Sequence, residues 1–396
     1  MAAADHDAGA HGAARYLRGR TGVRRIRRKS RGAERQDRGA TGRRTARSGR
    51  GASSGNRGHA HHRSYRRSGA AALAGIVLRR HDPGRSLADA PQRQAANAPL
   101  ALRFNPAFAD LLFEGSGHTY KELADLAAQG KPLPRFSLPA TLRAKFRVEA
   151  GDLKSDNILA TLPGSDAALA KEYIVVSAHL DGYGIGEPWN GDRIYNGAFD
   201  DAAYVATLID MAERLHESGK KLKRSLLFVV VTGEEKGLLG SKYFAAHPTI
   251  RKEQLVANIN LDQLRPIFPL KTLTTLALDE STLGDTVKQV AGAMDIRIQP
   301  DLEPERRLLT RSDHYSFMQI GVPAVGFIFG YEKGTPEEAV YRRWYAERYH
   351  SPADDLQQPW DPPAAAKFND FFNRLVETLA NADERPRWRA GSTFAR

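Results

Sequence analysis

The sequence predicts an α/β protein, a three-layer α/β/α sandwich built around a mostly parallel, twisted sheet. Three observations lead to this prediction. Short apolar runs rich in β-branched residues alternate with amphipathic helical segments, and 41% of the 396 residues are hydrophobic, which is enough for a large core. Strands that are apolar almost throughout are typical of a parallel sheet covered on both faces. We expect a disordered, arginine-rich segment before this fold.

The arginine-rich segment, residues 1–82, differs in composition from the rest of the chain. Residues 1–80 hold 21 of the 59 Lys+Arg but only 4 of the 46 Asp+Glu, so the remainder is mildly acidic. The segment has three interpretations: a basic arm that contacts phosphates, a disordered tail, or an artefact of a misplaced start or shifted reading frame. We expect no specific nucleic acid partner, and deleting residues 1–82 would test the basic arm.

The absence of cysteine limits the chemistry. It excludes disulfides, thiolate nucleophiles and cysteine zinc sites, so any metal must be bound by His, Asp or Glu. No apolar run approaches the ~18 residues of a membrane span, so none is expected. The apolar run Ala70–Leu78 resembles the core of a signal peptide but begins too far into the chain, so the compartment stays open.

The elements follow in chain order. A helix is expected around Tyr120–Gln129, and a strand pair is expected over residues 142–150 and 156–164. Further strands are expected over residues 172–179, 225–233, 255–262 and 323–330. The helix between the first two of these carries one apolar face, formed by Val205, Leu208, Ile209, Ala212 and Leu215. A last helix carries Phe368, Phe371, Phe372, Leu375, Val376 and Leu379.

Polar residues follow three of the predicted strands, where each strand ends. His179 and Asp181 follow the first, Glu234 and Glu235 the second, and Asp262 the third. Because ligands bind at the carboxyl ends of strands in an open α/β sheet, we expect these side chains to meet at one edge. Four carboxylates at one place cost several kcal/mol unless cations compensate them. Two divalent metals would do so, and this donor set suits zinc, with cobalt or manganese as substitutes.

Three other polar segments lie in the same half of the chain. Asp200 and Asp201 precede the predicted helix, where acids usually favour the helix N-terminus. Ser312–His314 and Tyr349–Pro352 would ordinarily be loop residues. Each segment alone has this ordinary explanation. Their order, together with the polar strand ends, favours a metal site.

These residues, in this order, resemble the co-catalytic zinc exopeptidases of the bacterial leucyl aminopeptidase family, whose relatives include glutamate carboxypeptidases and glutaminyl cyclases. The resemblance covers residues 142–385, expected to form a catalytic domain with the zinc-peptidase (phosphorylase/hydrolase-like) fold. The segment HLDGYGIGEPWNGDRIYNGAFDD is similar to a subgroup with a protease-associated insert. Residues 99–141 would be a remnant of that insert, and residues 386–396 a tail. Relatives of this subgroup are usually periplasmic or secreted.

The resemblance also implies roles for individual residues. The metal ligands would be His179 on one ion, Asp200 bridging both, Glu235 and Asp262 on one ion each, and His350 on the second. Asp181 would accept the other imidazole N–H of His179 and fix its tautomer. Glu234 would be the general base that activates a water held between the metals, and Tyr349 would assist the substrate carbonyl.

The chain departs from the family pattern beside the bridging position. Phe199 replaces an acid, and Ala203 and Tyr204 replace Ser-Gly. A tyrosine at position 204 could crowd the site.

The function that the resemblance implies is a metal-dependent aminopeptidase acting on peptides. A glutaminyl cyclase would use a similar ligand set with one zinc, and metal stoichiometry would decide between them. A carboxypeptidase would need cations for the substrate carboxylate, for which Arg306, Arg307 and Arg311 are available. A nucleic-acid-binding protein using the basic arm and an inactive, truncated relative remain as further alternatives.

Overall fold

The computed structural model describes residues 15–26, 79–80, 85–87, 102–103, 108–141, 150–262 and 264–395. The chain forms two compact units. One comprises Met1–Arg24, Arg85–Gln94 and Asp152–Arg396, and the other comprises Arg25–Gly84 and Ala95–Gly151. Among the described helices, none is long and apolar enough to cross a membrane.

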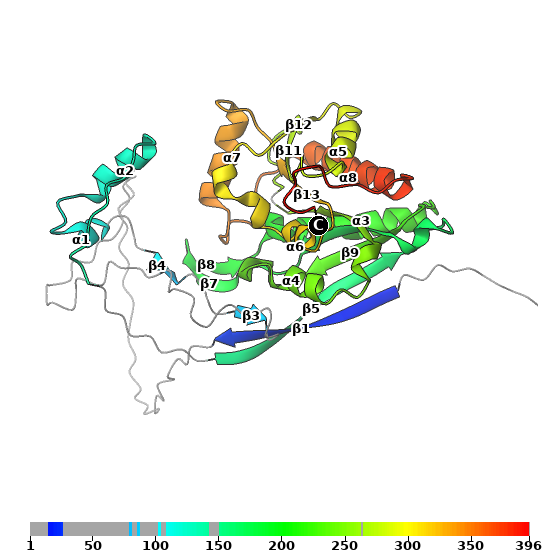
Figure 1. Ribbon diagram of the computed structural model, residues 1–396, viewed down its shortest axis with the longest axis horizontal. Helices are drawn as coiled ribbons and strands as arrows, with labels where there is room; N and C mark the ends of the chain where they lie inside the picture. The colour runs from blue at the N-terminus through cyan, green and yellow to red at the C-terminus, as the bar shows by residue number, and fades with distance from the viewer. Residues whose placement is uncertain are drawn as a thin grey trace, which may run out of the picture. The chain divides into compact units, whose positions relative to one another are not determined.

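The larger unit is built on a sheet with nine strands among the described residues, in the order β12-β11-β13-β10-β6-β9-β5-β1-β3 (Figure 1). Its central strands β13, β10, β6 and β9 are parallel, whereas β5 and β11 run antiparallel to their neighbours β9 and β13. The bounds of the strands are β1 (Arg15–Ile26), β3 (Arg85–Leu87), β5 (Ala150–Leu162), β6 (Tyr173–His179), β9 (Ser225–Val231), β10 (Leu255–Asn260), β11 (Thr272–Leu276), β12 (Arg297–Gln299) and β13 (Ala324–Phe329).

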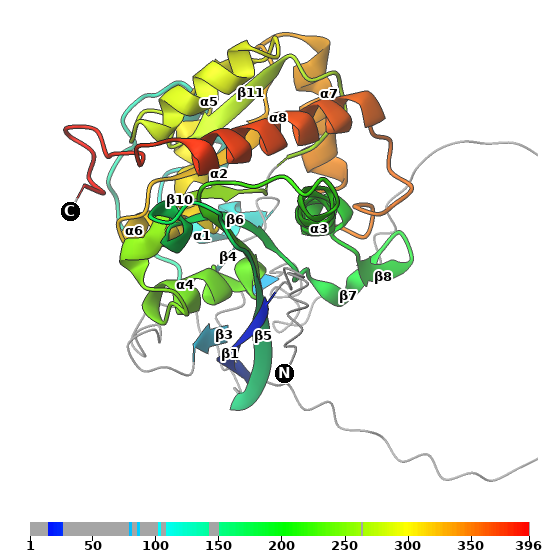
Figure 2. The same ribbon diagram turned by 90° about the vertical axis from the view of Figure 1, so that its right-hand side faces the viewer.

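Helices cover both faces of this sheet, as side chains that alternate along the strands require. In β6, Ile174 and Val176 pack into one apolar cluster and Val175 into the other. The first cluster includes residues of α3 (Ala203–Glu217), α5 (Leu283–Gly292) and α8 (Pro362–Asn381), and the second includes residues of α4 (Leu239–Ala246) and α6 (His314–Gln319). Figure 2 shows α3 on one side of the central strands and α4 and α6 on the other. The predicted three-layer fold is therefore confirmed.

The predicted elements of the catalytic region agree with the structure except in two places. The four core strands and both amphipathic helices form where they are expected. The first strand of the pair predicted over residues 142–164 falls mostly outside the described residues, and the second lies within β5. The predicted face of α3 is wrong at Ile209, which is 62% exposed. Tyr204 and Met211 are buried instead. The buried face of the helix is therefore rotated by about one residue from the predicted face.

Several elements were not predicted from the sequence. Strands β7 (Gly184–Trp189) and β8 (Asp192–Tyr195) form a separate antiparallel hairpin after β6. The short strands β11 and β12 extend the sheet, and helices α4, α5, α6 and α7 (Pro336–Glu347) complete the unit. The segment predicted as a tail packs against this unit, since the indole nitrogen of Trp388 donates to the carbonyl of Gly321 at 3.0 Å.

The smaller unit contains β2 (Arg79–Arg80), β4 (Leu102–Arg103), α1 (Asp110–Phe113) and α2 (Tyr120–Ala128) among the described residues. The expected helix around residue 120 is α2. It begins with a capping box in which Thr119 and Glu122 satisfy each other's backbone N–H groups. Whether this unit is the remnant of an insert stays a prediction.

Candidate metal centre

The candidate site lies at the carboxyl ends of three parallel neighbours, β10, β6 and β9. Strand β6 ends at His179, which is in register with Val231 at the end of β9. A 3-10 turn at Glu234–Lys236 follows β9, and Asp262 lies two residues beyond the end of β10. The parallel register therefore brings the polar residues of all three strand ends to the same edge.

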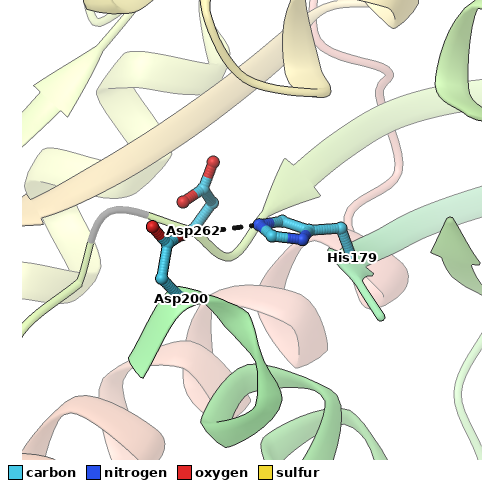
Figure 3. Close-up of side chains that lie close together, drawn as sticks. All are labelled: His179, Asp200 and Asp262. Carbon is cyan, nitrogen blue, oxygen red and sulfur yellow. Dashed lines mark ion pairs between the residues drawn. The ribbon is translucent and has the colours of Figure 1, made fainter. Parts of the chain in front are cut away.

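The predicted metal ligands lie in two groups that share Asp200. His179, Asp200 and Asp262 form the first group, shown in Figure 3. Asp200, Glu235 and His350 form the second. Within each group, one nitrogen or oxygen atom of each residue lies within 4.8 Å of the others. The structure thus brings together all five side chains that the sequence singled out as ligands.

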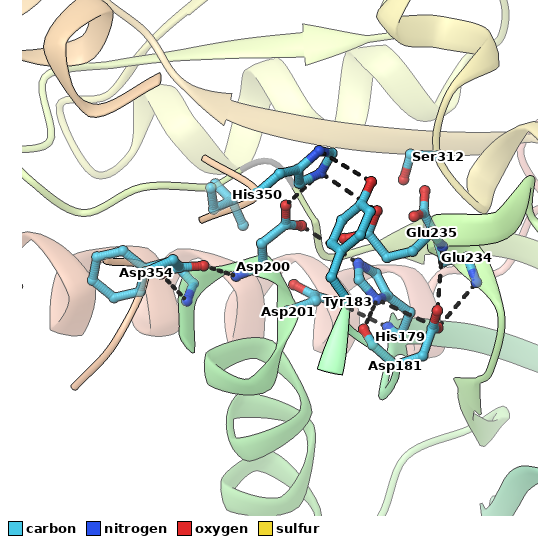
Figure 4. Close-up of polar contacts among 12 residues, drawn as sticks. His179, Asp181, Tyr183, Asp200, Asp201, Glu234, Glu235, Ser312, His350 and Asp354 are labelled. Atoms are coloured by element: carbon cyan, nitrogen blue, oxygen red, sulfur yellow. Dashed lines mark hydrogen bonds and ion pairs between the residues drawn. The ribbon is translucent and has the colours of Figure 1, made fainter. Parts of the chain in front are cut away.

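Both imidazoles direct the same ring nitrogen toward the carboxylates. The Nε2 atom of His179 lies 3.6 Å from Oδ1 of Asp200. The Nε2 atom of His350 lies 3.2 Å from Oδ2 of Asp200 and 3.4 Å from Oε2 of Glu235 (Figure 4). The two oxygens of one carboxylate therefore face two different imidazoles, an arrangement that suits a bridging ligand.

The turn Ala198–Ala202 presents Asp200 to both groups. It begins after Gly197, whose φ of +65° is left-handed and where an added Cβ would lie 2.4 Å from the carbonyl oxygen of Asp200. The Asp354 carboxylate holds the turn by accepting hydrogen bonds from the backbone N–H groups of Phe199 and Asp200 at 2.9 and 3.1 Å. Glycine at 197 and the acid at 354 thus fix the backbone of this turn.

Acids in the position of Asp200 and Asp201 ordinarily cap the following helix, but these two do not cap α3. Helix α3 begins at Ala203, and no side chain caps it. One carboxylate oxygen of Asp201 instead accepts the backbone N–H of His179 at 2.9 Å. Asp201 therefore ties the turn to the end of β6.

Asp181 contacts His179 differently from the expectation. Strand β6 ends before Asp181. The backbone carbonyl oxygen of Asp181 lies 3.0 Å from Nδ1 of His179 and is its hydrogen-bond partner. The carboxylate oxygen is farther, at 3.7 Å. That carboxylate accepts the N–H groups of Glu234 and Glu235 at 3.0 and 3.3 Å. The expected contact is thus made by the main chain, while the side chain orients the Glu234–Lys236 turn.

A fully buried arginine lies beside the shared carboxylate. Arg265 places NH2 3.5 Å from Oδ1 of Asp200, and its NH1 donates to the carbonyl of Phe199 at 3.0 Å. Its guanidinium carbon lies 4.6 Å from the ring centroid of Trp344. Burial raises the pKa of Asp200, but Arg265 and the neighbouring histidines lower it by more than burial raises it. The net shift is downward, so this carboxyl is ionised.

The two glutamates of the site behave in the opposite way in the metal-free protein. Burial raises the pKa of Glu234 well above its usual range, and burial with the Asp200 carboxylate raises the pKa of Glu235 to about 8. Burial lowers the pKa of His179, but the charge of Asp201 and other carboxylates raises it well above 6.5. In the metal-free protein, bound protons thus neutralise part of the negative charge that metal cations would neutralise when bound.

The residues present fit divalent metal ions. Each group offers imidazole nitrogen and carboxylate oxygen, the ligands that zinc takes in catalytic sites. Oδ2 of Asp200 is buried and forms no well-aligned hydrogen bond with the residues that the structure describes, although Nε2 of His350 lies 3.2 Å away. An oxygen left in this state costs free energy unless a cation lies beside it.

The remaining predicted residues lie near this centre. The Tyr349 ring stacks on His350 with centroids 3.6 Å apart. Asp313 is fully buried, and burial raises its pKa to about 7. Tyr204 does not line the pocket, because its ring packs edge-on against Phe368 in the core. Its hydroxyl nevertheless interacts electrostatically with Arg265, Asp201 and Asp262, so the expectation that it crowds the site stays a prediction.

Three residues of the site were missed by the sequence analysis: Tyr183, Arg265 and Asp354. Tyr183 stands between two glycines just after His179 and Asp181, and its hydroxyl lies 3.1 Å from Nδ1 of His350. Asp354 follows His350 within the same short segment. Their proximity in sequence to predicted ligands was the available signal. Arg265 offered none, since a single arginine after a strand is usually exposed.

Comparisons with known proteins show what the sequence is similar to. Residues 157–376 match the profile of Peptidase family M28. The chain is 25% identical over 208 residues to leupeptin-inactivating enzyme 1 from Streptomyces exfoliatus, covering 50% of this chain and 43% of that protein. It is 27% identical over 176 residues to carboxypeptidase Q from Xenopus laevis, covering 43% and 33%. The chain thus spans less than half the length of these curated relatives.

The chain also matches solved structures over part of its length. One is BSAP, a zinc aminopeptidase from Bacillus subtilis, with a TM-score of 0.44 and 18% sequence identity. The similarity covers 60% of this chain and 54% of that one.

Proposed function

The chain belongs to peptidase family M28, and from this premise we propose that it is a metal-dependent aminopeptidase that hydrolyses N-terminal peptide bonds. One observation carries the proposal. Two donor groups, each with one imidazole, share the Asp200 carboxylate at the edge of the sheet. This arrangement supports a pair of divalent ions, zinc in the first place and cobalt or manganese as substitutes.

The pocket beside the second group supports an exopeptidase. It is lined by Gly182, Tyr183, Tyr195, Gly197, Asp200, Glu235, His350, Ser351 and Asp354. We propose that it receives the terminal residue of a peptide beside the ions. None of the described residues that line it is an arginine or lysine that could pair with a terminal carboxylate, which favours the amino end of a substrate.

The proposed ligands are His179, Asp200 and Asp262 for one ion, and Asp200, Glu235 and His350 for the other. When bound, the ions would supply a water of lowered pKa and positive charge near the substrate carbonyl. The protein fixes the ligands through the Asp181 carbonyl on His179 and the Asp354 carboxylate under the Asp200 turn. These contacts support a centre whose geometry is set before substrate binds.

Glu234 is the proposed general base. Its carboxylate is buried beside His179, and burial raises its pKa, which is the direction expected for a carboxyl group that takes up and returns a proton. Glu234 would take a proton from the attacking water while the water oxygen bonds to the carbonyl carbon. It would then give that proton to the leaving nitrogen as the carbon–nitrogen bond breaks. Tyr349 would donate its hydroxyl proton in a hydrogen bond to the carbonyl oxygen.

Hydrolysis of a panel of aminoacyl-4-nitroanilides tests the function. We expect turnover that a chelator abolishes and that added zinc restores. Glu234→Gln should keep its metal content and lose 10²- to 10⁴-fold in kcat, roughly the contribution of a general base. Glu213→Gln, an exposed glutamate on α3, is the matched control. Near wild-type turnover of Glu234→Gln with metals bound would show that the assigned base is wrong.

Metal content and reaction products, measured on the same purified protein, separate the alternative functions. Two ions per chain with aminopeptidase turnover support the proposal, whereas one ion with cyclisation of N-terminal glutamine would identify a glutaminyl cyclase. A carboxypeptidase is less well supported, because the candidate cation Arg306 already donates to Glu303 at 2.9 Å.

A further inference from the structure

Tyr183 occupies a defined place beside the second donor group. It lies in the loop between β6 and β7, and its hydroxyl oxygen is 3.1 Å from Nδ1 of His350 (Figure 4). The two rings lie with centroids 4.5 Å apart. The Lys236 ammonium group lies 4.5 Å from the centroid of the tyrosine ring. The phenol is thus held by two neighbours and not merely exposed at the pocket wall.

The Glu235 carboxylate of the same donor group lies close by. Its Oε2 atom is 3.4 Å from Nε2 of His350, and burial together with the charge of Glu235 raises the pKa of Tyr183. An imidazole that binds an ion through Nε2 carries its proton on Nδ1. In that tautomer, Nδ1 of His350 would donate its proton to the Tyr183 hydroxyl oxygen, which can accept a hydrogen bond and still donate its own proton.

We propose that Tyr183 is a positioning residue that orients His350 as a ligand of one metal ion and holds it in its metal-binding tautomer. The inference rests on the proposed function, since it requires an ion at the second donor group. Partners of this kind, which contact ligands and not the ion, typically change metal affinity 10- to 100-fold.

The two imidazole ligands have different partners, which makes the proposal selective. Nδ1 of His179 meets the backbone carbonyl oxygen of Asp181 at 3.0 Å, a contact that no side-chain substitution removes. Nδ1 of His350 depends on the Tyr183 side chain. Loss of the Tyr183 hydroxyl should therefore weaken the binding of one ion and leave the binding of the other unchanged.

The test is a Co²⁺ titration of the full metal-free chain, followed by calorimetry and by the visible absorption of bound cobalt. We expect Tyr183→Phe to bind one of two ions 10- to 100-fold more weakly, with an altered spectrum for that ion. The melting temperature of its metal-free form should equal that of the wild type. Tyr331→Phe is the matched control, because its hydroxyl donates to the Glu303 carboxylate at 3.2 Å and the residue belongs to neither donor group nor to the pocket, so metal affinity should not change.

The outcomes separate this inference from the proposed function. If the wild type binds two ions and Tyr183→Phe binds both with unchanged affinity, the positioning role is overturned and the proposed function stands. Equal weakening of both ions, or a lower melting temperature without metal, would also overturn it in favour of a structural role. If the wild type binds no cobalt, the proposed function fails, and the inference fails with it.

Discussion

Asp200 contributes to both donor groups, so its charge matters more than that of any single ligand in one group. We expect Asp200→Asn to lose both ions, because an amide keeps the shape but provides a neutral, weaker ligand. Measurement of bound zinc after gel filtration checks this. Asp210→Asn on the outer side of α3, 45% exposed at its side chain, is the control and should retain two ions. Retention of both ions by Asp200→Asn would contradict the shared-ligand assignment.

Arg265 gives a second prediction about single residues. Its guanidinium pairs with Asp200 at 3.5 Å in a fully buried position, and breaking a buried ion pair costs about 3–5 kcal/mol. We expect Arg265→Met to lose stability of that order without metal, and less with zinc, because bound cations replace the lost positive charge. Urea unfolding with and without zinc measures both values.

Arg224 is the matched control for this prediction. It is also buried, but it pairs with Glu172 at 2.7 Å away from the donor groups. Arg224→Met should therefore cost the same stability with and without zinc. An Arg265→Met variant whose loss is independent of zinc would show that its role is packing, for example against Trp344.

At the level of the elements, the sequence predicted the core better than the edges. Apolar strands such as β6 and β10 are recognisable because both faces are buried. The β7–β8 hairpin was missed because its residues are mostly exposed and carry no apolar alternation. The face of α3 was misjudged because Ile209 is apolar but exposed, whereas Tyr204 and Met211 are buried.

The site shows the same limit. Strand ends gave His179, Glu235 and Asp262, because the edge of a parallel sheet is fixed by its topology. The contact from the Asp181 carbonyl to His179 could not be predicted, since it depends on where β6 ends and how the chain turns. Arg265 could not be predicted either, because its burial follows from three-dimensional contacts with Asp200 and not from local pattern.

The turn Ala198–Ala202 provides a prediction at this scale. At Gly197 an added Cβ would lie 2.4 Å from the Asp200 carbonyl oxygen and the φ is +65°, so Gly197→Ala should displace the turn. We expect a loss of about 2–4 kcal/mol in unfolding free energy and weaker zinc binding. Gly191→Ala in the β7–β8 turn is the control, with a φ of +90° but nothing near the added Cβ. Equal losses in both variants would mean that backbone conformation alone, without the clash, explains the effect.

At the scale of the whole molecule, the arginine-rich segment and the folded body differ in charge. The sequence has a net charge of +13, yet 42 of its 46 acidic residues lie after residue 80. Several of those acids are buried together at one sheet edge, including Asp200, Asp201, Glu234 and Asp262. The stability of the metal-free protein should therefore depend on how these carboxylates are neutralised, first by protons and then by cations.

The last prediction concerns this dependence on pH. The pKa of Glu235 rises from 4.5 to about 8 on folding, and that of Asp313 rises from 3.8 to about 7, chiefly because both are buried. The folded state thus keeps protons that the unfolded chain has released, so raising the pH favours unfolding. The raised pKa of His179 acts in the same direction, since its stabilising charge is lost as the pH rises.

We therefore expect the metal-free protein to lose at least about 3 kcal/mol of unfolding free energy between about pH 5 and about pH 8. Zinc should oppose this loss, because ligands that have released their protons bind it more tightly, and its stabilising effect should grow over the same range. Urea unfolding at three pH values, with and without zinc, measures both trends. Glu235→Gln should flatten the metal-free profile, since a neutral amide removes one titrating group. A metal-free protein that gains stability as the pH rises would contradict the assignment of these buried carboxylates as the groups that cations neutralise.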